Sequence, residues 1–351
     1  MLILGCEFTA HTFGVGIVDS TGNILANTKD SYTTTQQVGL IPNLVAAHHE
    51  QVAEKVLAQA FQVSKAAGKN IGGDDIAFIA YSAGPGLDPC LLAGYKIVKA
   101  WAEKFGKRLV GVNHCAAHLS IGKLWNKVND PCYLYVSGVN TQIIVQEGGK
   151  YRIVGETLDL GLGNMLDKFA RILGLGFPGG PKIEELAKKG NYVELSYVVK
   201  GMDVSFSGIL TKSEQLLKKG FSKEDLCFSL QETCFAMLTE VVERALAHTE
   251  KSELVLVGGV GANKRFGEML QIMCRERGAQ FYNVPRELAT DNGAMIAWEG
   301  YLRYLQKRRL DKAGEFRGSY ESGKSDDLGE SGGSGELGNF GIKPHWRVEE
   351  V

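Results

Sequence analysis

The sequence predicts an α/β protein made of two domains that repeat one pattern. Its 351 residues are enough for two domains, each with a hydrophobic core of its own. Each half of the chain starts with three short apolar runs that are joined by small, polar or glycine-containing turns. Each half then continues with helical and strand-like patterns in alternation. This repeat indicates two related α/β halves.

The first half is typical of a three-strand meander followed by alternating helices and strands. A small, polar tip at residues 8–12 joins the first two strands, and such a tip can hold a phosphate or be an ordinary turn. The expected elements are strands at 2–7, 13–19 and 23–30, a helix at 44–66, a strand at 76–82, a helix at 90–105 and a strand at 108–112.

The second half begins the same pattern again at Pro131. Its expected elements are strands at 132–137, 142–147 and 151–156, helices at 164–173, 181–189 and 222–249, a strand at 253–257, a helix at 264–277, a strand at 280–284 and a final helix at 292–306. Two such halves, with polar hairpin tips that converge on a central nucleotide cleft, describe the actin/sugar-kinase/Hsp70-like ATPase fold.

These patterns also place the expected domain boundaries. We expect an N-terminal ATPase-like domain at residues 1–129, joined by the last helix at about 292–310, and a C-terminal ATPase-like domain at residues 130–291. Residues 311–341 are rich in Gly, Ser, Glu and Asp, which is typical of a disordered tail. The terminal segment, residues 342–351, is more structured in character and is expected to dock back or to contact a partner.

The composition limits the classes of function. The net charge is −1, whereas a self-sufficient nucleic-acid binder usually carries a basic surplus, so a nucleic-acid substrate would need partner subunits or a local basic patch. The seven cysteines are scattered without a Cys-x-x-Cys pair, which is typical of free thiols in a reducing compartment. No stretch approaches the ~20 apolar residues of a membrane span. We therefore expect a cytoplasmic protein.

Two histidines that follow the apolar run at residues 109–112 are the first candidates for chemistry. If a strand ends near Asn113 and a helix follows, the i, i+4 spacing of His114 and His118 puts both imidazoles on one face of the first helical turn. Two neutral imidazoles at this spacing are half of a transition-metal site. The alternative is a polar helix start, in which one histidine caps the helix and the other is buried.

Asp291 lies where a loop is expected to pass into the final helix. Taken alone, an aspartate at such a junction is most simply an N-cap. Its carboxylate is also the donor type that completes a metal site with two histidines and an oxygen donor, leaving one position open for substrate.

Three glycine-rich stretches are candidates for a nucleotide cradle, because glycine lets a ligand approach where a Cβ would collide. They are residues 137–141 at a hairpin tip, 174–180 before a helix, and 256–263 from a strand into a helix. The third is neither a P-loop nor a dinucleotide fingerprint, and tight strand-to-helix packing is its alternative. The carboxylate of Asp167 is a candidate to bind the ribose hydroxyls of a nucleotide. The alternative is that it forms ion pairs with Lys168 and Arg171 on a solvent-exposed helix face.

Several longer motifs carry a resemblance to a known family. The motifs are VNHCAAH at 112–118, YVSGVNTQ at 135–142, GETLD at 155–159, DKFAR at 167–171, PGGP at 178–181, KGMDVSFSG at 200–208 and DNGAM at 291–295. Together they closely resemble the tRNA N6-adenosine threonylcarbamoyltransferase family, formerly the O-sialoglycoprotein endopeptidase family. The similarity runs from residue 2 to about 310. The stretches at 7–12 and 202–208 look like the archaeal/eukaryotic branch, which supplies the catalytic subunit of the KEOPS complex.

The resemblance implies the two-domain ATPase-like fold and an activity. The threonylcarbamoyl group of L-threonylcarbamoyl-AMP would pass to N6 of adenosine 37 in tRNAs that read ANN codons, forming t6A. One divalent ion per subunit, Fe or Zn, would be held by His114, His118, Tyr135 and Asp291, and His114, His118 and Asp291 would be the catalytic set. The protein would bind threonylcarbamoyl-AMP and also ATP. The residues that would bind substrate and nucleotide are Tyr135, Ser137, Gly138, Val139, Asn140, Asp167, Gly180, Glu184 and Asn263.

The resemblance also implies partners. These are tRNA and three KEOPS-type subunits: a small protein-kinase-like subunit on the C-terminal domain, a small dimerising subunit on the N-terminal helices, and a tRNA-binding accessory subunit. Neither a membrane nor DNA is expected as a primary partner. The near-neutral charge fits a chain that needs partners to bind tRNA.

A mechanism follows as a hypothesis. The metal would bind the threonylcarbamoyl moiety and polarise its carbonyl, the glycine-rich tips would stabilise the AMP leaving group, and the adenosine amine would attack without a protein nucleophile. The sequence departs from the family at Val139, Asp88 and Gly261, none of which removes an expected ligand. Val139 stands where the family usually has a second glycine. If this position needs φ > 0, a β-branched residue is disfavoured and nucleotide binding would be weaker or differently posed.

Three other functions compete with this interpretation. A metalloprotease would share the histidine spacing of His-Glu-x-x-His, but Cys115 stands where the general-base glutamate belongs. A sugar or acetate kinase on the same fold would need a carboxylate base that faces a sugar pocket. A nucleotide-binding scaffold subunit of a KEOPS-type complex, with weak or no transferase activity, is the third, and Val139 is the residue that favours it.

Overall fold

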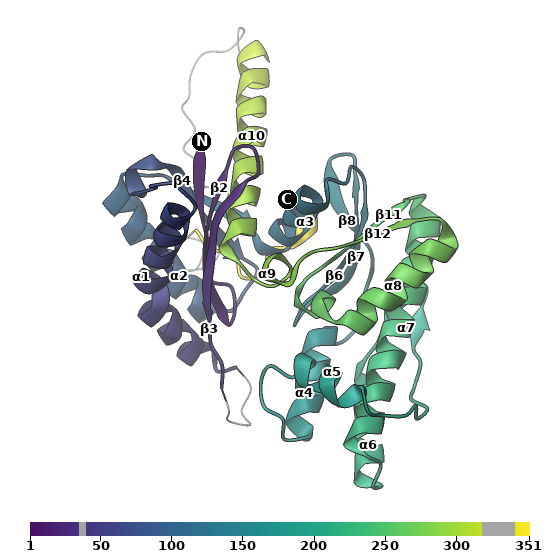
Figure 1. Cartoon of the computed structure of the whole chain (residues 1–351). Helices are drawn as coiled ribbons and strands as arrows, with labels where there is room; N and C mark the ends of the chain where they lie inside the picture. The colour runs from purple at the N-terminus through teal and green to yellow at the C-terminus, as the bar shows by residue number, and fades with distance from the viewer. Residues whose placement is uncertain (35–39, 318–340) are drawn as a thin grey trace. The chain divides into compact units, whose positions relative to one another are not determined.

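The computed structural model describes residues 1–34, 40–317 and 341–351 (Figure 1). The chain divides into two compact units, each built on a five-stranded sheet. Unit 1 consists of Met1–Tyr32, Leu40–Ile121 and Asp291–Val348. Unit 2 consists chiefly of Gly122–Thr290. The α/β class predicted from the sequence is confirmed.

Unit 1 is a mixed sheet covered by helices. Its strand order is β3-β2-β1-β4-β5, in which β1, β2 and β3 form an antiparallel meander and β4 and β5 run parallel to β1. The carboxyl ends of β1, β4 and β5 therefore meet at one edge. The elements are β1 (Leu2–Glu7), β2 (Thr12–Asp19), β3 (Ile24–Ser31), α1 (Pro42–Ala66), β4 (Ile76–Gly84), α2 (Asp88–Phe105), β5 (Leu109–Asn113), the start of α3 (His114–Asn126) and α10 (Gly293–Arg317).

Glycines bring α10 unusually close to this sheet. A Cβ on Gly5 or on Gly16 would lie 2.2 Å from a backbone nitrogen of α10, that of Ala297 or of Ala294 respectively. No side chain fits at that distance, so these strand positions need glycine. Helices α1 and α2 pack against each other on the other face (Figure 1). The start of α10 is thus fixed against the sheet that also positions α3.

Unit 2 repeats the strand order of unit 1. Its sheet runs β8-β7-β6-β11-β12, again with an antiparallel meander of three strands and two strands parallel to the first of them. The main elements are β6 (Cys132–Val136), β7 (Thr141–Glu147), β8 (Lys150–Glu156), α4 (Leu162–Ile172), α5 (Gly180–Ala187), α6 (Ser207–Lys218), α7 (Lys223–Thr249), β11 (Glu253–Val257), α8 (Lys264–Arg277), β12 (Gln280–Asn283) and α9 (Arg286–Ala289).

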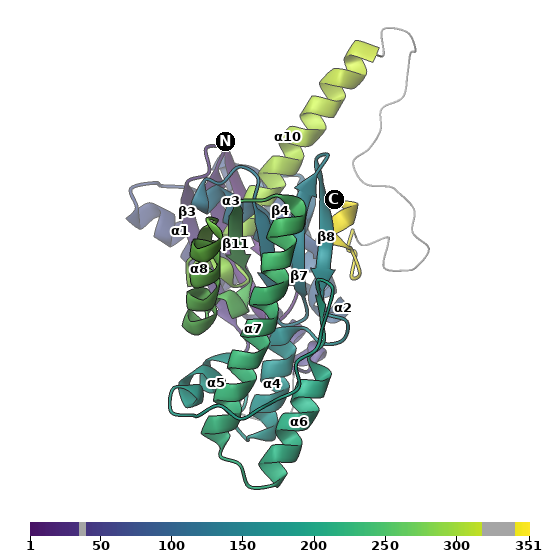
Figure 2. The ribbon, with the colours of Figure 1, turned by 90° about the vertical axis from the view of Figure 1, so that its right-hand side faces the viewer.

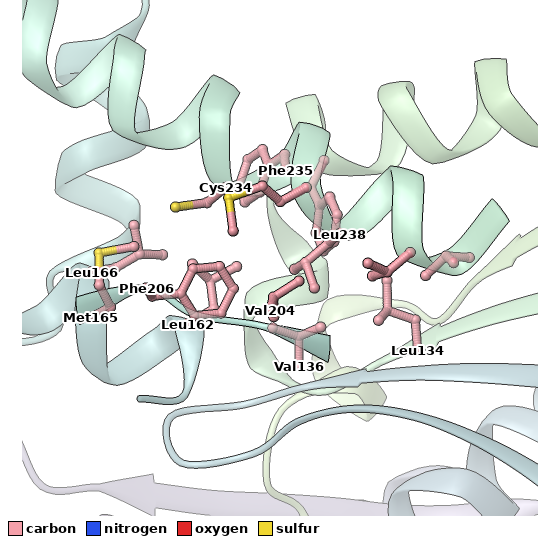
Figure 3. Close-up of a cluster of buried hydrophobic side chains, with 14 of the residues drawn as sticks. Leu134, Val136, Leu162, Met165, Leu166, Val204, Phe206, Cys234, Phe235 and Leu238 are labelled. Atoms are coloured by element: carbon pink, nitrogen blue, oxygen red, sulfur yellow. The ribbon is translucent and has the colours of Figure 1, made fainter. Parts of the chain in front are cut away.

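The core of unit 2 lies between this sheet and α7, which also reaches the group of α4, α5 and α6 (Figure 2). Figure 3 shows its side chains pointing toward one another from β6, α4 and α7. Among them are Leu134, Val136, Leu162, Met165, Phe235 and Leu238, each at most 1% exposed. Burial of one such side chain stabilises the fold by about 1.5–3 kcal/mol relative to exposure.

Four elements were not predicted from the sequence. Helix α6 was not expected, because its N-terminus is capped by a residue far away in the sequence: Asp159 accepts hydrogen bonds from the backbone N–H of Phe206 and of Ser207. The short helix α9 and the two-stranded β9 (Val199–Lys200) and β10 (Asp203–Val204) were also missed.

The final helix is longer than predicted. Helix α10 runs on to Arg317, so the first residues assigned to the tail, 311–317, are helical. Its last turns are rich in Lys, Arg, Leu, Ala and Glu, which are strong helix formers, and composition alone did not separate them from the tail. The rest of the predicted tail, residues 318–340, lies outside the described residues. No helix in the described ranges is long and apolar enough to cross a membrane.

Candidate functional site

Helix α3 begins where β5 ends, at the edge of unit 1 that carries the carboxyl ends of the parallel strands. Strand β5 finishes at Asn113 and the helix starts at His114, as the spacing predicted. Asn113 Oδ1 accepts a hydrogen bond from the N–H of Ala116 at 3.0 Å, so asparagine caps the helix. Neither histidine is needed as a cap, and both project from the first turn.

Asp291 lies just before α10 and does not cap it. The N–H of Met295 donates instead to Oδ1 of Asn292, at 3.0 Å, so the N-cap interpretation of Asp291 is wrong. Lys29 Nζ donates to the backbone oxygen of Asp291 at 3.0 Å, which holds this segment against unit 1. The carboxylate of Asp291 is therefore available to the histidine pair.

His114, His118 and Asp291 form one compact cluster within unit 1. Asp291 Oδ1 lies 3.3 Å from His118 Nε2 and 3.7 Å from His114 Nε2. One ligand atom from each of the three residues lies within 4.8 Å of the other two, and the histidines are buried. Two imidazole nitrogens and a carboxylate oxygen are a donor set that iron and zinc both accept. The residues present therefore fit a divalent transition metal.

A carboxylate that sequence reasoning missed orients the first of these histidines. Glu7, the last residue of β1, places Oε2 2.9 Å from His114 Nδ1 and is fully buried. Its other oxygen accepts hydrogen bonds from the N–H and the hydroxyl of Thr9, at 2.7 and 2.6 Å. A carboxylate on Nδ1 makes that nitrogen the donor and leaves Nε2 free for a metal. The available signal was a lone acid at the end of a buried apolar strand.

The charged groups of the cluster shift one another's pKa values. Burial alone would lower the pKa of His114, but the charge and hydrogen bond of Glu7, together with the charge of Asp291, raise it to about 9. Burial lowers the pKa of His118. Burial would raise the pKa of Asp291, but the hydrogen bond and charges of the two histidines hold it below its usual range. A cation between carboxylates is thus favoured at this position.

The other predicted site residues belong to unit 2. Tyr135 is a fully buried residue of β6. Next to it, the hairpin tip between β6 and β7 closes on itself: Ser137 N–H donates to the backbone oxygen of Asn140 at 2.8 Å, and Asn140 N–H donates to Ser137 Oγ at 3.1 Å. The N–H of Asn164, on α4, donates to the backbone oxygen of Gly138 at 2.8 Å. The tip is thereby joined to α4.

Val139 is accommodated without backbone strain. It is 70% exposed at the tip. Lys127 and Glu250 are the non-glycine residues with positive φ in the described ranges, and Val139 is not one of them. The condition under which valine would be disfavoured is therefore not met.

The remaining nucleotide candidates connect the second and third glycine-rich stretches. Asp167, on α4, accepts a hydrogen bond at 2.7 Å from the N–H of Gly179, directly before Gly180 and α5. Glu184, on α5, accepts one at 3.0 Å from the N–H of Lys264 at the start of α8. Asn263 caps α8 by accepting from the N–H of Phe266 at 3.1 Å. The side chains of Asp167 and Glu184 thus connect α4 to the start of α5 and α5 to the start of α8.

The third stretch is also tightly packed, as its alternative interpretation predicted. Gly258 has φ +92°, and a Cβ there would lie 2.4 Å from the backbone oxygen of Val136. This close approach requires glycine whether or not a nucleotide binds nearby.

The fold is similar to that of several solved structures. The structure is similar to HypF from T. kodakarensis, with a TM-score of 0.60 and 14% identity over 87% of this chain and 48% of HypF. It is also similar to component A of the (R)-2-hydroxyglutaryl-CoA dehydratase of Acidaminococcus fermentans, with a TM-score of 0.53 and 15% identity over 86% and 98% of the two chains. The fold is the predicted actin/sugar-kinase/Hsp70-like ATPase fold.

Sequence comparison identifies the family within that fold. Residues 23–298 match the family model for tRNA N6-adenosine threonylcarbamoyltransferase. Proteins of that name from Thermococcus kodakarensis and Thermofilum pendens are 51% and 45% identical, over 87% and 99% of this chain and 92% and 95% of their own lengths. The chain belongs to the tRNA N6-adenosine threonylcarbamoyltransferase family, as its motifs indicated.

Proposed function

We propose that this protein transfers the threonylcarbamoyl group of L-threonylcarbamoyl-AMP to N6 of adenosine 37 in tRNAs that read ANN codons. Membership of the family supports the reaction. The observation in the structure that carries the proposal is the buried cluster of His114, His118 and Asp291, with Glu7 behind it. A cluster with two imidazoles and two carboxylates at a sheet edge is a functional-site candidate on physical grounds.

The cluster would hold one divalent ion, Fe or Zn. Its ligands would be Nε2 of His114, Nε2 of His118 and the carboxylate of Asp291, and the family resemblance adds Tyr135. Bound here, the ion supplies Lewis-acid polarisation of a carbonyl oxygen. Glu7 keeps the proton of His114 on Nδ1, so that Nε2 stays available. Lys29 and Asn292 keep the segment that carries Asp291 in place.

The nucleotide would bind in unit 2 at the three glycine-rich stretches. At this hairpin tip, the hydroxyl of Ser137, the side-chain amide of Asn140 and the backbone N–H groups of Gly138 and Val139 are donors that would suit phosphate oxygens. Gly180 and Asn263 lie at the starts of α5 and α8, and Asp167 and Glu184, within α4 and α5, are hydrogen-bonded to the backbone at those starts. Helix N-termini favour anions, so this edge suits the AMP leaving group.

In this reaction the adenosine N6 attacks the carbamoyl carbon. A C–N bond forms, the bond from that carbon to the phosphate oxygen breaks, AMP leaves and the amine loses a proton. No protein nucleophile is required. All seven cysteines are buried, which accords with this route.

Two of the three competing functions, the metalloprotease and the scaffold, lose their main support. The carboxylate nearest His114 Nδ1 is Glu7, which is already bonded to Thr9 and lies on the ring nitrogen away from Asp291, so it does not act as the water-activating base of a metalloprotease. Val139, the residue that favoured an inactive scaffold, is unstrained and exposed.

We propose the assembly and location on the family resemblance. The partners would be tRNA and KEOPS-type subunits, namely a small protein-kinase-like subunit, a small dimerising subunit and a tRNA-binding accessory subunit. The location would be cytoplasmic. The expected ATPase-like domains, residues 1–129 with the last helix and residues 130–291, stay a prediction.

Reconstitution tests the activity. The protein would be combined with candidate partner subunits, threonine, bicarbonate, ATP, a threonylcarbamoyl-AMP synthase and an ANN-decoding tRNA, and nucleoside mass spectrometry would measure t6A. We expect t6A with the wild type and with the control His248→Ala, an exposed histidine of α7, and none with His114→Ala/His118→Ala. Product that persists in the double variant would remove the metal role. No product from the wild type, while an authentic homologue works in the same mixture, would contradict the proposed reaction.

A further inference from the structure

A segment near the end of the chain lies in unit 1 beside the start of the histidine helix. We call residues 342–348 the C-terminal strap. Three of its side chains, those of Ile342, Trp346 and Val348, are 2–7% exposed, although most of the strap has no regular secondary structure. Side chains of this kind are buried only when a shaped surface receives them. The strap is therefore docked.

The strap is hydrogen-bonded to the turn that follows β4. Lys343 N–H donates to the backbone oxygen of Ala83 at 2.6 Å, and Gly86 N–H donates to that of Pro344 at 3.2 Å. At Gly84, φ is +145° and a Cβ would lie 1.9 Å from the backbone oxygen of Lys343. Only glycine permits this approach, so the turn around Gly84 is shaped to receive the strap.

Trp346 links the strap to β5 through a cation. The guanidinium of Arg303, on α10, lies 4.8 Å from the ring centroid of Trp346, and the ammonium of Lys343 lies 4.5 Å from it. Arg303 also donates to the backbone oxygen of Gly111 at 3.0 Å, two residues before the end of β5. The indole thus holds Arg303 against the strand that leads into α3.

Asn113 connects the strap directly to the histidine helix. Its side-chain amide donates to the backbone oxygen of Trp346 at 3.0 Å, while its side-chain oxygen accepts from Ala116 N–H and caps α3. Asn113 is fully buried. Without the strap its amide would lose its acceptor in a buried place, which is unfavourable, and the cap would lose its fixed orientation.

We propose that the C-terminal strap is a positioning element for the metal ligands. By fixing Asn113, it holds the first turn of α3, from which His114 and His118 reach Asp291. Trp346 and Asn113 are then positioning residues rather than ligands. The inference depends on the metal assignment in the proposed function, but its test measures metal binding and helix order instead of group transfer.

Four full-length variants test the strap. Trp346→Ala removes the ring, and Trp346→Phe keeps an aromatic face for Arg303 and Lys343. Asn113→Ser keeps a good capping oxygen but lacks the amide donor to Trp346. The matched control is Trp125→Ala, at the far end of α3, where the side chain is 50% exposed. Competition with a chelator would give the dissociation constants of Zn²⁺ and Co²⁺, and the visible spectrum of bound Co²⁺ would report the ligand field.

We expect Trp346→Ala and Asn113→Ser to weaken metal binding by about tenfold or more and to change the Co²⁺ spectrum, as loss of a residue that orients a ligand does. Trp346→Phe should restore most of the affinity, and Trp125→Ala should leave it unchanged. Hydrogen exchange should accelerate at the amides of Ala116–His118 and not at Trp125. If Trp346→Ala does not fold, the metal affinity and Co²⁺ spectrum of Asn113→Ser test the inference.

Two results would overturn the inference in distinguishable ways. If Asn113→Ser and any folded Trp346 variant bind metal like the wild type, with the same Co²⁺ spectrum, the strap only adds stability, while the proposed function stands. If the wild type itself binds no metal, the metal assignment fails and the inference fails with it.

Discussion

The two units share one sheet topology but differ in how the hairpin tip after the first strand is bonded. In unit 1, the tip after β1 turns inward: Glu7 and Thr9 are bonded to each other and to His114. In unit 2, the equivalent tip after β6 bonds to itself and leaves Val139 exposed. The first tip was interpreted as a phosphate holder or as an ordinary turn, and both stay predictions. What the structure adds is its contact with His114, the residue that we propose as a metal ligand. The fold supplies the position and the side chains supply the chemistry.

The largest expected effect is a loss of stability caused by a substitution in unit 2. Gly258→Ala forces a Cβ toward the backbone oxygen of Val136 at positive φ and should lower the free energy of unfolding by about 3 kcal/mol or more. The control, Gly220→Ala, has nearly the same φ but open space around its Cβ, and should cost only about 1–2 kcal/mol. Urea unfolding would measure both. Equal costs would mean that the close approach at Gly258 is absent.

In unit 1, a buried histidine that bonds the hairpin tip should make the free energy of unfolding depend on pH. His49, fully buried, bonds the backbone oxygen of Ala10 at 2.9 Å, and burial lowers its pKa to about 4. The unfolded chain, with a histidine pKa near ~6.5, binds more protons between these values, so stability is complete above pH ~6.5 and falls by up to about 3 kcal/mol as the pH drops toward 4. Urea unfolding at several pH values should show a smaller fall for His49→Gln. An identical fall in both proteins would contradict this assignment.

The substitution Glu7→Gln tests whether the hairpin tip of unit 1 contributes to metal affinity. The amide still fits, but it cannot hold a proton on His114 Nδ1 by charge, so metal affinity should fall by about 10–100-fold. Chelator competition measures the change, with the exposed Glu185→Gln of unit 2 as control. An unchanged dissociation constant for Glu7→Gln would show that Glu7 serves only the fold.

The smallest effect is expected at the tip of unit 2. Val139→Gly should change the dissociation constant for AMP or ATP by no more than about twofold, because the side chain is exposed and the backbone is not strained there. Calorimetric titration measures it. A gain of tenfold or more would show that valine does impair the nucleotide loop.

Local patterns predicted the parts of the site that are local. The i, i+4 spacing placed His114 and His118 on the first turn of α3, and the three apolar runs in each half gave both meanders. Taken alone, Asp291 was interpreted as an N-cap because an acid before a helix usually caps it, yet Asn292 does so. That choice depends on backbone direction, which the sequence does not display.

Parts that depend on distant residues were not predictable in this way. Glu7 meets His114 across more than a hundred residues, and only the parallel pairing of β1, β4 and β5 puts them at one edge. Helix α6 was not predicted because the residue that caps it, Asp159, lies far upstream in the sequence. The composition of residues 342–351 indicated a structured segment. It did not indicate that the backbone oxygen of Trp346 would accept a hydrogen bond from Asn113.

X-ray absorption at the metal edge tests the central claim most directly. For the zinc- or iron-loaded wild type, we predict scattering from two imidazoles with nitrogen at about 2.0–2.1 Å and from oxygen ligands. The imidazole signal should vanish in His114→Ala/His118→Ala and persist in the control His248→Ala. An unchanged spectrum in the double variant would place the metal elsewhere and contradict the assignment of this cluster as the metal centre.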